Sequence, residues 1–327
     1  MASDYYQIKA LSHSMLSCLA QNPMECRMRY VDDPPTLPKK DSAAFAMGHA
    51  VHCLAHEPER FDERFVVVEK VLSANSTAGQ IAAWLLDKNN EGKAFPWVAK
   101  PEDINRRTNA GKAEWEAFVR QCLMEHQIIV DKHEIQLARN YADKVRGKTI
   151  LDQQDHADAV ACVQALNNHA EFATIMAQPR RVEAEHHFDL FGHRFKARLD
   201  CIVDSMRLIL DIKTTDDASP HRWQWSAVDY GYHRQQIIYQ EALRQATGKG
   251  YRFIFAVVEK PKPSTRGIPP TVALYELKEE SVLMGVDDTQ DLVCEYERRT
   301  KENDWQQLYS DGIVPLRLPK RRVYEGE

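Results

Sequence analysis

The stretch Arg198–Thr215, RLDCIVDSMRLILDIKTT, limits the possible folds more than any other part of the chain. Within it, Arg207–Lys213 alternates between aliphatic and other residues, which predicts a β-strand. Asp204 and Ser205 supply a turn between this strand and the preceding run, Phe195–Val203. The sequence therefore predicts a β-hairpin.

Charged side chains occupy one face of the second strand of this hairpin. Its leucines and Ile212 share the other face, whereas Asp211 and Lys213 lie together, roughly 7 Å apart by strand rise. Asp200, near the end of the paired strand, can reach the same point. Burying such charges is costly unless they have partners. Two carboxylates and a lysine suit a hard divalent cation, although a salt-bridged structural hairpin explains them equally well.

Segments upstream of the hairpin offer further ligands. Arg181–Phe188 is polar and alternating, and it predicts a neighbouring strand that carries Glu183 and Glu185 on one face. Either glutamate could complete an acidic cluster. Nearer the N-terminus, Ala43–His56 predicts a helix that contains His52.

A helix is also predicted downstream of the hairpin, over Tyr232–Leu243. Gln235 and Tyr239 lie four residues apart, so this helix presents both side chains on one face.

In this order, the elements resemble the PD-(D/E)XK nuclease superfamily. The likeness is to its RecE (exonuclease VIII) branch, relatives of the RecB and phage lambda exonuclease domains, and it extends from about Ser12 to about Glu259. Five segments carry it: Gly48–Phe61, Ile104–Trp115, Arg198–Asp204, Leu210–Thr215 and Tyr230–Leu243.

The resemblance implies a role for each residue of the cluster. Asp200 and Asp211 match the two metal-binding carboxylates, and Lys213 matches the lysine beside the attacking water. His52 matches the helix histidine of the metal shell. Glu185 matches the additional glutamate, with Glu183 as the alternative.

Gln235 and Tyr239 match the helix residues that orient the lysine, the water or the DNA backbone. Arg106, Arg107 and Lys112 lie in a segment that shares the resemblance, and we expect them to contact DNA phosphates.

The resemblance also implies a fold and an activity. The fold is α/β, with a mixed sheet flanked by helices. The activity is Mg²⁺-dependent 5′-to-3′ digestion of linear double-stranded DNA, with Mn²⁺ able to substitute. The product is a 3′ single strand for a RecT-like annealing protein in phage-type DNA recombination, and the enzyme is a ring-shaped homo-oligomer. A structure-specific or restriction-type endonuclease and a catalytically silent nuclease-fold interaction module are the alternatives.

Composition restricts the setting of such an enzyme. The chain has a net charge of −5, so phosphate binding requires local basic clusters. No apolar run is long enough to span a membrane, and the N-terminus lacks a secretory pattern. Seven scattered cysteines predict a reducing cytoplasm. The resemblance adds that some RecB-like nucleases hold an iron–sulfur cluster with a closely spaced C-terminal set of cysteines, and with only Cys294 beyond Cys201 we expect no such cluster here. The sequence contains no glycine-rich phosphate-binding loop, so we expect no use of ATP.

We expect one nuclease domain over 1–327, with an α/β core wrapped by helices. Its parts are a mainly helical region over 1–180 that includes His52, a catalytic sheet over 181–278, a C-terminal helix over 279–309 and a basic tail over 310–327.

Overall fold

A computed structural model gives the fold and describes residues 5, 8–37, 43–69, 71–91, 93–104, 107–306 and 313. The helices are α1 (His13–Gln21), α2 (Pro23–Cys26), α3 (Ala43–His56), α4 (Phe61–Arg64), α5 (Thr77–Leu86), α6 (Asn109–Met124), α7 (Lys132–Val145), α8 (Gln153–Asn168), α9 (Ala170–Met176), α10 (Pro220–Asp229), α11 (Tyr232–Thr247) and α12 (Glu279–Glu302). The strands are β1 (Phe65–Val68), β2 (Trp97–Ala99), β3 (Ile128–Val130), β4 (Thr149–Asp152), β5 (Arg181–Leu190), β6 (His193–Val203), β7 (Leu208–Thr215), β8 (Arg252–Glu259) and β9 (Val272–Tyr275).

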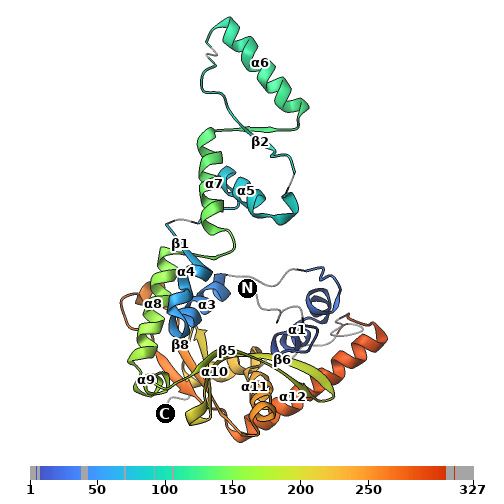
Figure 1. Cartoon of the computed structure of the whole chain (residues 1–327), viewed down its shortest axis with the longest axis vertical. Helices are drawn as coiled ribbons and strands as arrows, with labels where there is room; N and C mark the ends of the chain where they lie inside the picture. Colours follow the sequence, from blue (N-terminus) through green and yellow to red (C-terminus); the bar gives the residue numbers. More distant parts are fainter. Residues whose placement is uncertain are drawn as a thin grey trace.

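A mixed sheet in the strand order β5-β6-β7-β8-β9 forms the centre of the larger, lower part of the molecule, which we call the body (Figure 1). Its neighbours pair antiparallel except β7 and β8, which are parallel. A parallel pair needs a crossover, and here the chain passes through α10 and α11 between the two strands. The predicted hairpin is confirmed as β6 and β7, and the expected α/β class is confirmed as well.

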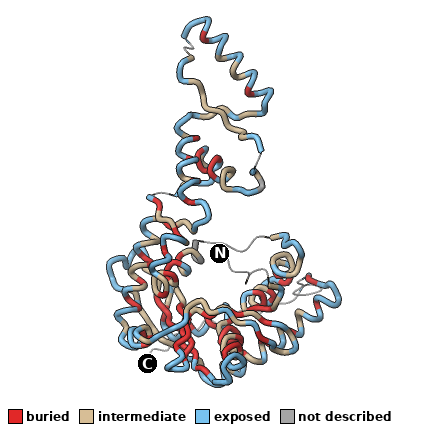
Figure 2. The backbone as a smooth tube through the Cα atoms, in the orientation of Figure 1, coloured by how far each residue is buried: buried red, intermediate tan, exposed pale blue. Residues whose placement is uncertain are grey.

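Each face of this sheet has its own apolar core. Leu208, Leu210 and Ile212 of β7 pack with residues of α3, α8 and α9 on one face. Ile209 packs on the other face with residues of α1, α10, α11 and α12. The alternation predicted for this strand is therefore confirmed, and Figure 2 shows the buried residues concentrated along the body's sheet.

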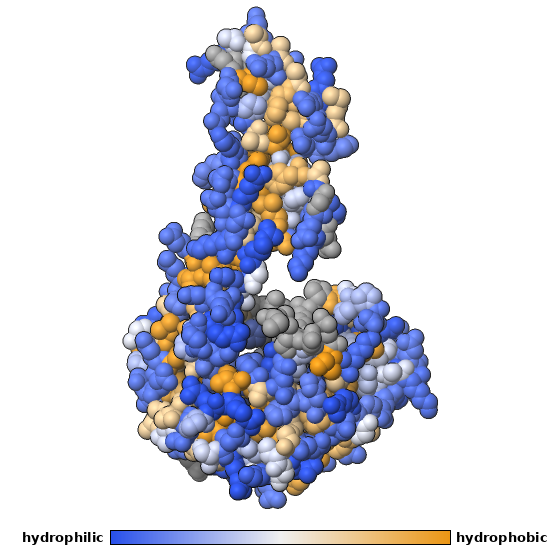
Figure 3. All heavy atoms as spheres, in the orientation of Figure 1, coloured by the Kyte–Doolittle hydropathy of each residue, from blue (hydrophilic) through white to orange (hydrophobic). Residues whose placement is uncertain are grey.

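The chain between β1 and β4 forms an arm, which we define as α5, β2, α6, β3 and α7 (Thr77–Val145). The arm projects away from the body, so its helices do not cover the central sheet (Figure 1). Its apolar residues form a separate small cluster around Ile81, Ile135 and Ala138. This cluster lets the arm bury side chains without contacting the sheet, and Figure 3 shows other apolar side chains at its surface.

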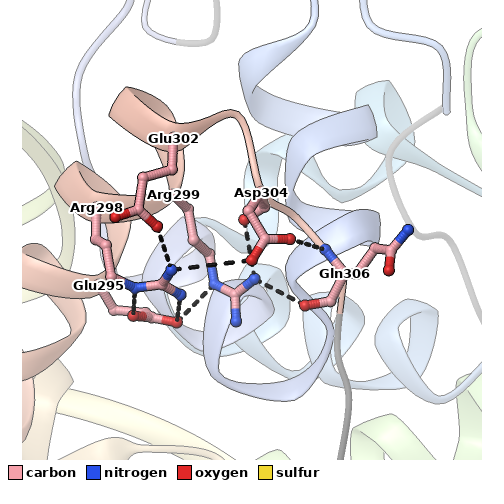
Figure 4. A network of polar contacts seen from close by, with 6 residues as sticks. All are labelled: Glu295, Arg298, Arg299, Glu302, Asp304 and Gln306. Carbon is pink, nitrogen blue, oxygen red and sulfur yellow. Dashed lines mark hydrogen bonds and ion pairs between the residues drawn. The ribbon is translucent and has the colours of Figure 1, made fainter.

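The last described helix, α12, ends at Glu302 and not at residue 309. Asn303 adopts a left-handed conformation, with φ at 52°, which ends the helix. The buried Arg299 then holds the following turn, because its guanidinium donates to the backbone carbonyls of Asp304 and Gln306 at 3.1 and 2.9 Å (Figure 4). Of the expected basic tail over 310–327, all but Ile313 lies outside the described residues. In the described parts of the chain, no helix is long and apolar enough to cross a membrane.

We expect Arg299→Ala to lower the free energy of unfolding by about 1–3 kcal/mol, because two carbonyls lose a charged donor. Urea denaturation measures the change. Arg298→Ala is the control, since Arg298 pairs with Glu295 and Glu302 at the surface, where ion pairs contribute little. Equal losses in both variants would contradict a special role for Arg299.

Candidate active site

The candidate site lies where β6 and β7 separate. Their pairing extends from Val203↔Leu208 to Cys201↔Leu210, and Asp200 and Asp211 are the next residue on each strand. Beyond this point β6 continues beside β5, and β7 continues beside β8. The end of the shared ladder therefore places two carboxylates side by side in the interior.

The Asp211 carboxylate is fully buried and has two polar partners. The Lys213 Nζ atom lies 2.5 Å from its Oδ2 atom. The Gln235 Nε2 atom, on α11, donates to its Oδ1 atom at 2.7 Å. Burial raises the pKa of Asp211, the Lys213 ammonium opposes that rise, and the neighbouring Asp200 carboxylate adds to it. A metal cation between the two carboxylates would relieve the same repulsion.

The Lys213 ammonium is held in its charged form. Burial lowers its pKa, but the Asp211 carboxylate, Tyr232 and Asp200 together raise the pKa above its ordinary value. Its Nζ atom also lies 4.8 Å from the centre of the Tyr232 ring, which is a cation–π contact. The position of this charge is therefore fixed from two sides.

His52 reaches the site from α3, which packs on the sheet face that carries Leu208, Leu210 and Ile212. Its Nε2 atom lies 2.7 Å from the Asp200 Oδ2 atom. Burial lowers the pKa of His52, but the Asp200 carboxylate outweighs it, so the pKa is raised. Burial likewise raises the pKa of Asp200, but His52 and then Lys213 bring it below the usual value.

Glu183 completes a cluster in which one atom each from His52, Glu183 and Asp200 lies within 4.8 Å of the others. The pairing of β5 with β6 keeps one register from Val182↔Cys201 to Ala184↔Leu199, which places Glu183 opposite Asp200. Glu183 has a φ of 52°, an uncommon conformation for a residue with a side chain, and such strain clusters at functional sites.

Glu185 lies opposite Arg198, two residues along the ladder from Glu183, and outside this cluster. Arg198 contacts both glutamates, with its Nε atom 3.2 Å from Glu183 and its Nη1 atom 3.9 Å from Glu185. Of the two alternatives left by the sequence, the structure therefore brings Glu183 nearer to Asp200.

The donor set fits a hard divalent cation. One ligand atom each from His52, Glu183 and Asp200 lies within 4.8 Å of the others, so a single small cation could contact all three. Carboxylate oxygens with one imidazole suit Mg²⁺ or Mn²⁺.

The remaining predicted residues fall in two places. Tyr239 lies one turn after Gln235 on α11, and burial, followed by the charges of Asp200 and Asp211, raises its pKa well above the usual value. Arg107 and Lys112 are exposed on the arm, and the structure does not bring them to the cluster. Arg106 lies outside the described residues.

Sequence reasoning missed Arg198 and Tyr232. Both had a detectable signal: Arg198 precedes Asp200 by two positions on one strand, so the two side chains share a face. Tyr232 precedes Gln235 by three positions on one helix, which is the spacing of neighbouring side chains on a helical face.

Comparison with known protein families decides the assignment. The family described as "PDDEXK-like domain of unknown function (DUF3799)" matches residues 111–307, well over half of the chain. The chain belongs to this PDDEXK-like family. The superfamily resemblance noted in the sequence is therefore confirmed, and the matched region contains Asp200, Asp211 and Lys213 but not His52.

A solved structure agrees with the fold of this PDDEXK-like protein. The chain is similar to a "Putative exonuclease" from Eubacterium rectale, with a TM-score of 0.52 and 13% identity over 98% of this chain and 96% of that one. A phage related exonuclease from Haemophilus somnus 129PT matches with a TM-score of only 0.29 and 14% identity, over 63% of this chain and 92% of that one. No curated protein matches. At these identities, the first likeness supports the fold alone.

Proposed function

We propose that this PDDEXK-like protein is a metal-dependent nuclease that hydrolyses phosphodiester bonds of DNA. The observation that carries the proposal is the convergence of His52, Glu183 and Asp200 beside the buried Asp211–Lys213 pair. Cation ligands next to a fixed ammonium suit a reaction in which negative charge develops on phosphoryl oxygens.

Each side chain has a role in this proposal. Asp200 and Asp211, with His52 and Glu183, would hold one or two Mg²⁺ ions. When bound, such an ion lowers the pKa of a coordinated water and neutralises phosphoryl charge. Lys213 positions the attacking water and stabilises the developing charge. Gln235 keeps the Asp211 carboxylate in place by its 2.7 Å hydrogen bond. Tyr239 lies one turn later on the same face of α11, where it would help to orient the lysine, the water or the DNA backbone.

The finer assignment is an exonuclease that digests linear double-stranded DNA from 5′ to 3′ and supplies 3′ strands to a RecT-like annealing protein. The RecE-like order of the sequence segments supports this assignment, and the name of the Eubacterium rectale neighbour supports exonuclease activity alone. A ring-shaped homo-oligomer belongs to the same assignment. Arg107 and Lys112 on the arm would contact phosphates outside the cluster, together with Arg106.

Purified protein, Mg²⁺ and linear duplexes labelled at either the 5′ or the 3′ end test this proposal. We expect release of the 5′ label first, no cleavage in chelator, and no effect on covalently closed circles. If the protein instead nicks the circles and leaves linear DNA intact, it is an endonuclease and the exonuclease assignment is wrong. No cleavage with either Mg²⁺ or Mn²⁺ would favour a silent nuclease-fold module and overturn the proposal.

A pair of matched variants decides between the two glutamates. We expect Glu183→Gln to weaken Mg²⁺ binding at least about tenfold, since even groups that only support a metal ligand contribute this much. Glu185→Gln should change binding less, although both glutamates contact Arg198 on the same strand pair. Mg²⁺ titration of the cleavage rate measures both. A larger effect in Glu185→Gln would reverse the assignment.

A further inference from the structure

Two aromatic rings connect Lys213 to the protein surface. The Tyr232 ring lies 4.8 Å from the Lys213 Nζ atom. The ring of Tyr230 stacks near Tyr232, with centroids 5.7 Å apart and planes at 28°. Tyr232 packs against the core that contains Ile209, whereas Tyr230 is 57% exposed. The exposed Tyr230 ring is therefore linked to the candidate catalytic ammonium through the ring of Tyr232.

A glycine turn fixes this pair of rings. Tyr230 is the C-cap residue that follows α10, Tyr232 begins α11, and Gly231 between them has a φ of 70°. A Cβ atom at Gly231 would lie 2.1 Å from the Nη2 atom of Arg234, so another residue there would strain the turn and displace this side chain. The Gly231 carbonyl accepts from the backbone N–H groups of Arg234 and Gln235, which ties the turn to the helix that carries Gln235.

The inner ring is further held by its neighbours. Tyr232 contacts Trp223 with centroids 5.1 Å apart and planes at 25°, and Trp223 is buried. Tyr230 therefore presents a ring backed by rigid aromatic packing. A large exposed ring on such a support contributes little to the core and is suited to stacking on a flat ligand.

We propose that Tyr230 is a stacking platform for an unpaired nucleobase of the strand that is cut. This inference rests on the proposed nuclease function and names its substrate class. Inside a duplex both faces of each base are covered by neighbouring bases, so a protein ring can stack only on a terminal, frayed or single-stranded base. Tyr230 would hold that base while its phosphate lies near Lys213. The platform thus favours strand ends over continuous duplex.

A single-stranded oligonucleotide that carries 2-aminopurine at its end tests the platform in chelator, without cleavage. We expect stacking to quench the probe with wild-type protein and with Tyr230→Phe, which keeps the ring. Tyr230→Ala should lose most of the quenching and bind roughly tenfold more weakly, the typical effect of removing one base-stacking ring. With Mg²⁺, the same variant should raise KM and leave kcat nearly unchanged, because the ring does not touch the reacting atoms.

Trp225→Ala is the matched control, because Trp225 is also an exposed aromatic residue. It lies on α10, five residues before Tyr230, and lines a groove between α10 and α12. This variant should quench and cleave like wild type. Wild-type quenching and KM in Tyr230→Ala would overturn the platform while cleavage by the wild type still upheld the nuclease. If the wild type neither cleaves nor binds DNA, the proposed function itself fails.

Discussion

Asp211→Asn should lower the cleavage rate at least about a thousandfold, because it removes a carboxylate that we propose binds the metal and is also the charge partner of Lys213. Asparagine has nearly the same shape and keeps a carbonyl oxygen that can accept from Gln235, so the fold should persist. Single-turnover cleavage of a labelled linear duplex at saturating Mg²⁺ measures the loss.

Thermal unfolding gives a second reading of this variant. Mg²⁺ should raise the Tm of the wild type, since a ligand that binds only the folded state stabilises it, and should raise the Tm of Asp211→Asn much less. Asp216→Asn is the control: this exposed carboxylate, just past β7, pairs with Lys260 and should leave both readings unchanged. Wild-type cleavage by Asp211→Asn would remove Asp211 from the site.

Lys213→Met should lower kcat at least about a hundredfold while the Mg²⁺ dependence changes little. The change removes an ammonium that we propose stabilises the reacting phosphate, and losing one preorganised group of this kind typically costs about 10²–10³-fold. The carboxylate and imidazole ligands stay, so the Mg²⁺-induced rise in Tm should remain. That combination separates Lys213 from Asp211, whose replacement should lose both.

Lys260→Met is the control for this second change. Lys260 directly follows β8, the strand that pairs in parallel with β7, and its ammonium lies 2.8 Å from the exposed Asp216. Removing it should leave kcat unchanged. If Lys213→Met cleaves at the wild-type rate, or if both variants lose the same activity, Lys213 has no specific role in the reaction.

Much of the site follows from local patterns in the sequence. The hairpin, the burial of Asp211 and the convergence of Asp200, Asp211 and Lys213 depend on strand alternation within one short segment. Gln235 and His52 depend only on helical runs that pack against this sheet. Such short-range regularities determine which side chains share a face.

Features that depend on longer-range or unusual geometry could not be predicted. Glu183 and Glu185 share a strand face, and only the ladder register and the left-handed backbone of Glu183 distinguish them. The arm could not be foreseen either. Ile81 and Ile135 are ordinary core residues in sequence, and nothing local indicates that they form a cluster apart from the sheet.

The arm leaves the body after β1 and returns at β4, and these two strands pair in parallel, Phe65 beside Thr149 and Val68 beside Asp152. The arm therefore leaves at the end of β1 and returns at the start of β4, and these two points are separated by only the length of one short strand pair. Shortening, lengthening or exchanging everything between them would leave the catalytic sheet untouched. Such a layout lets this inserted segment vary in length and sequence without disturbing the strands that carry Asp200 and Asp211.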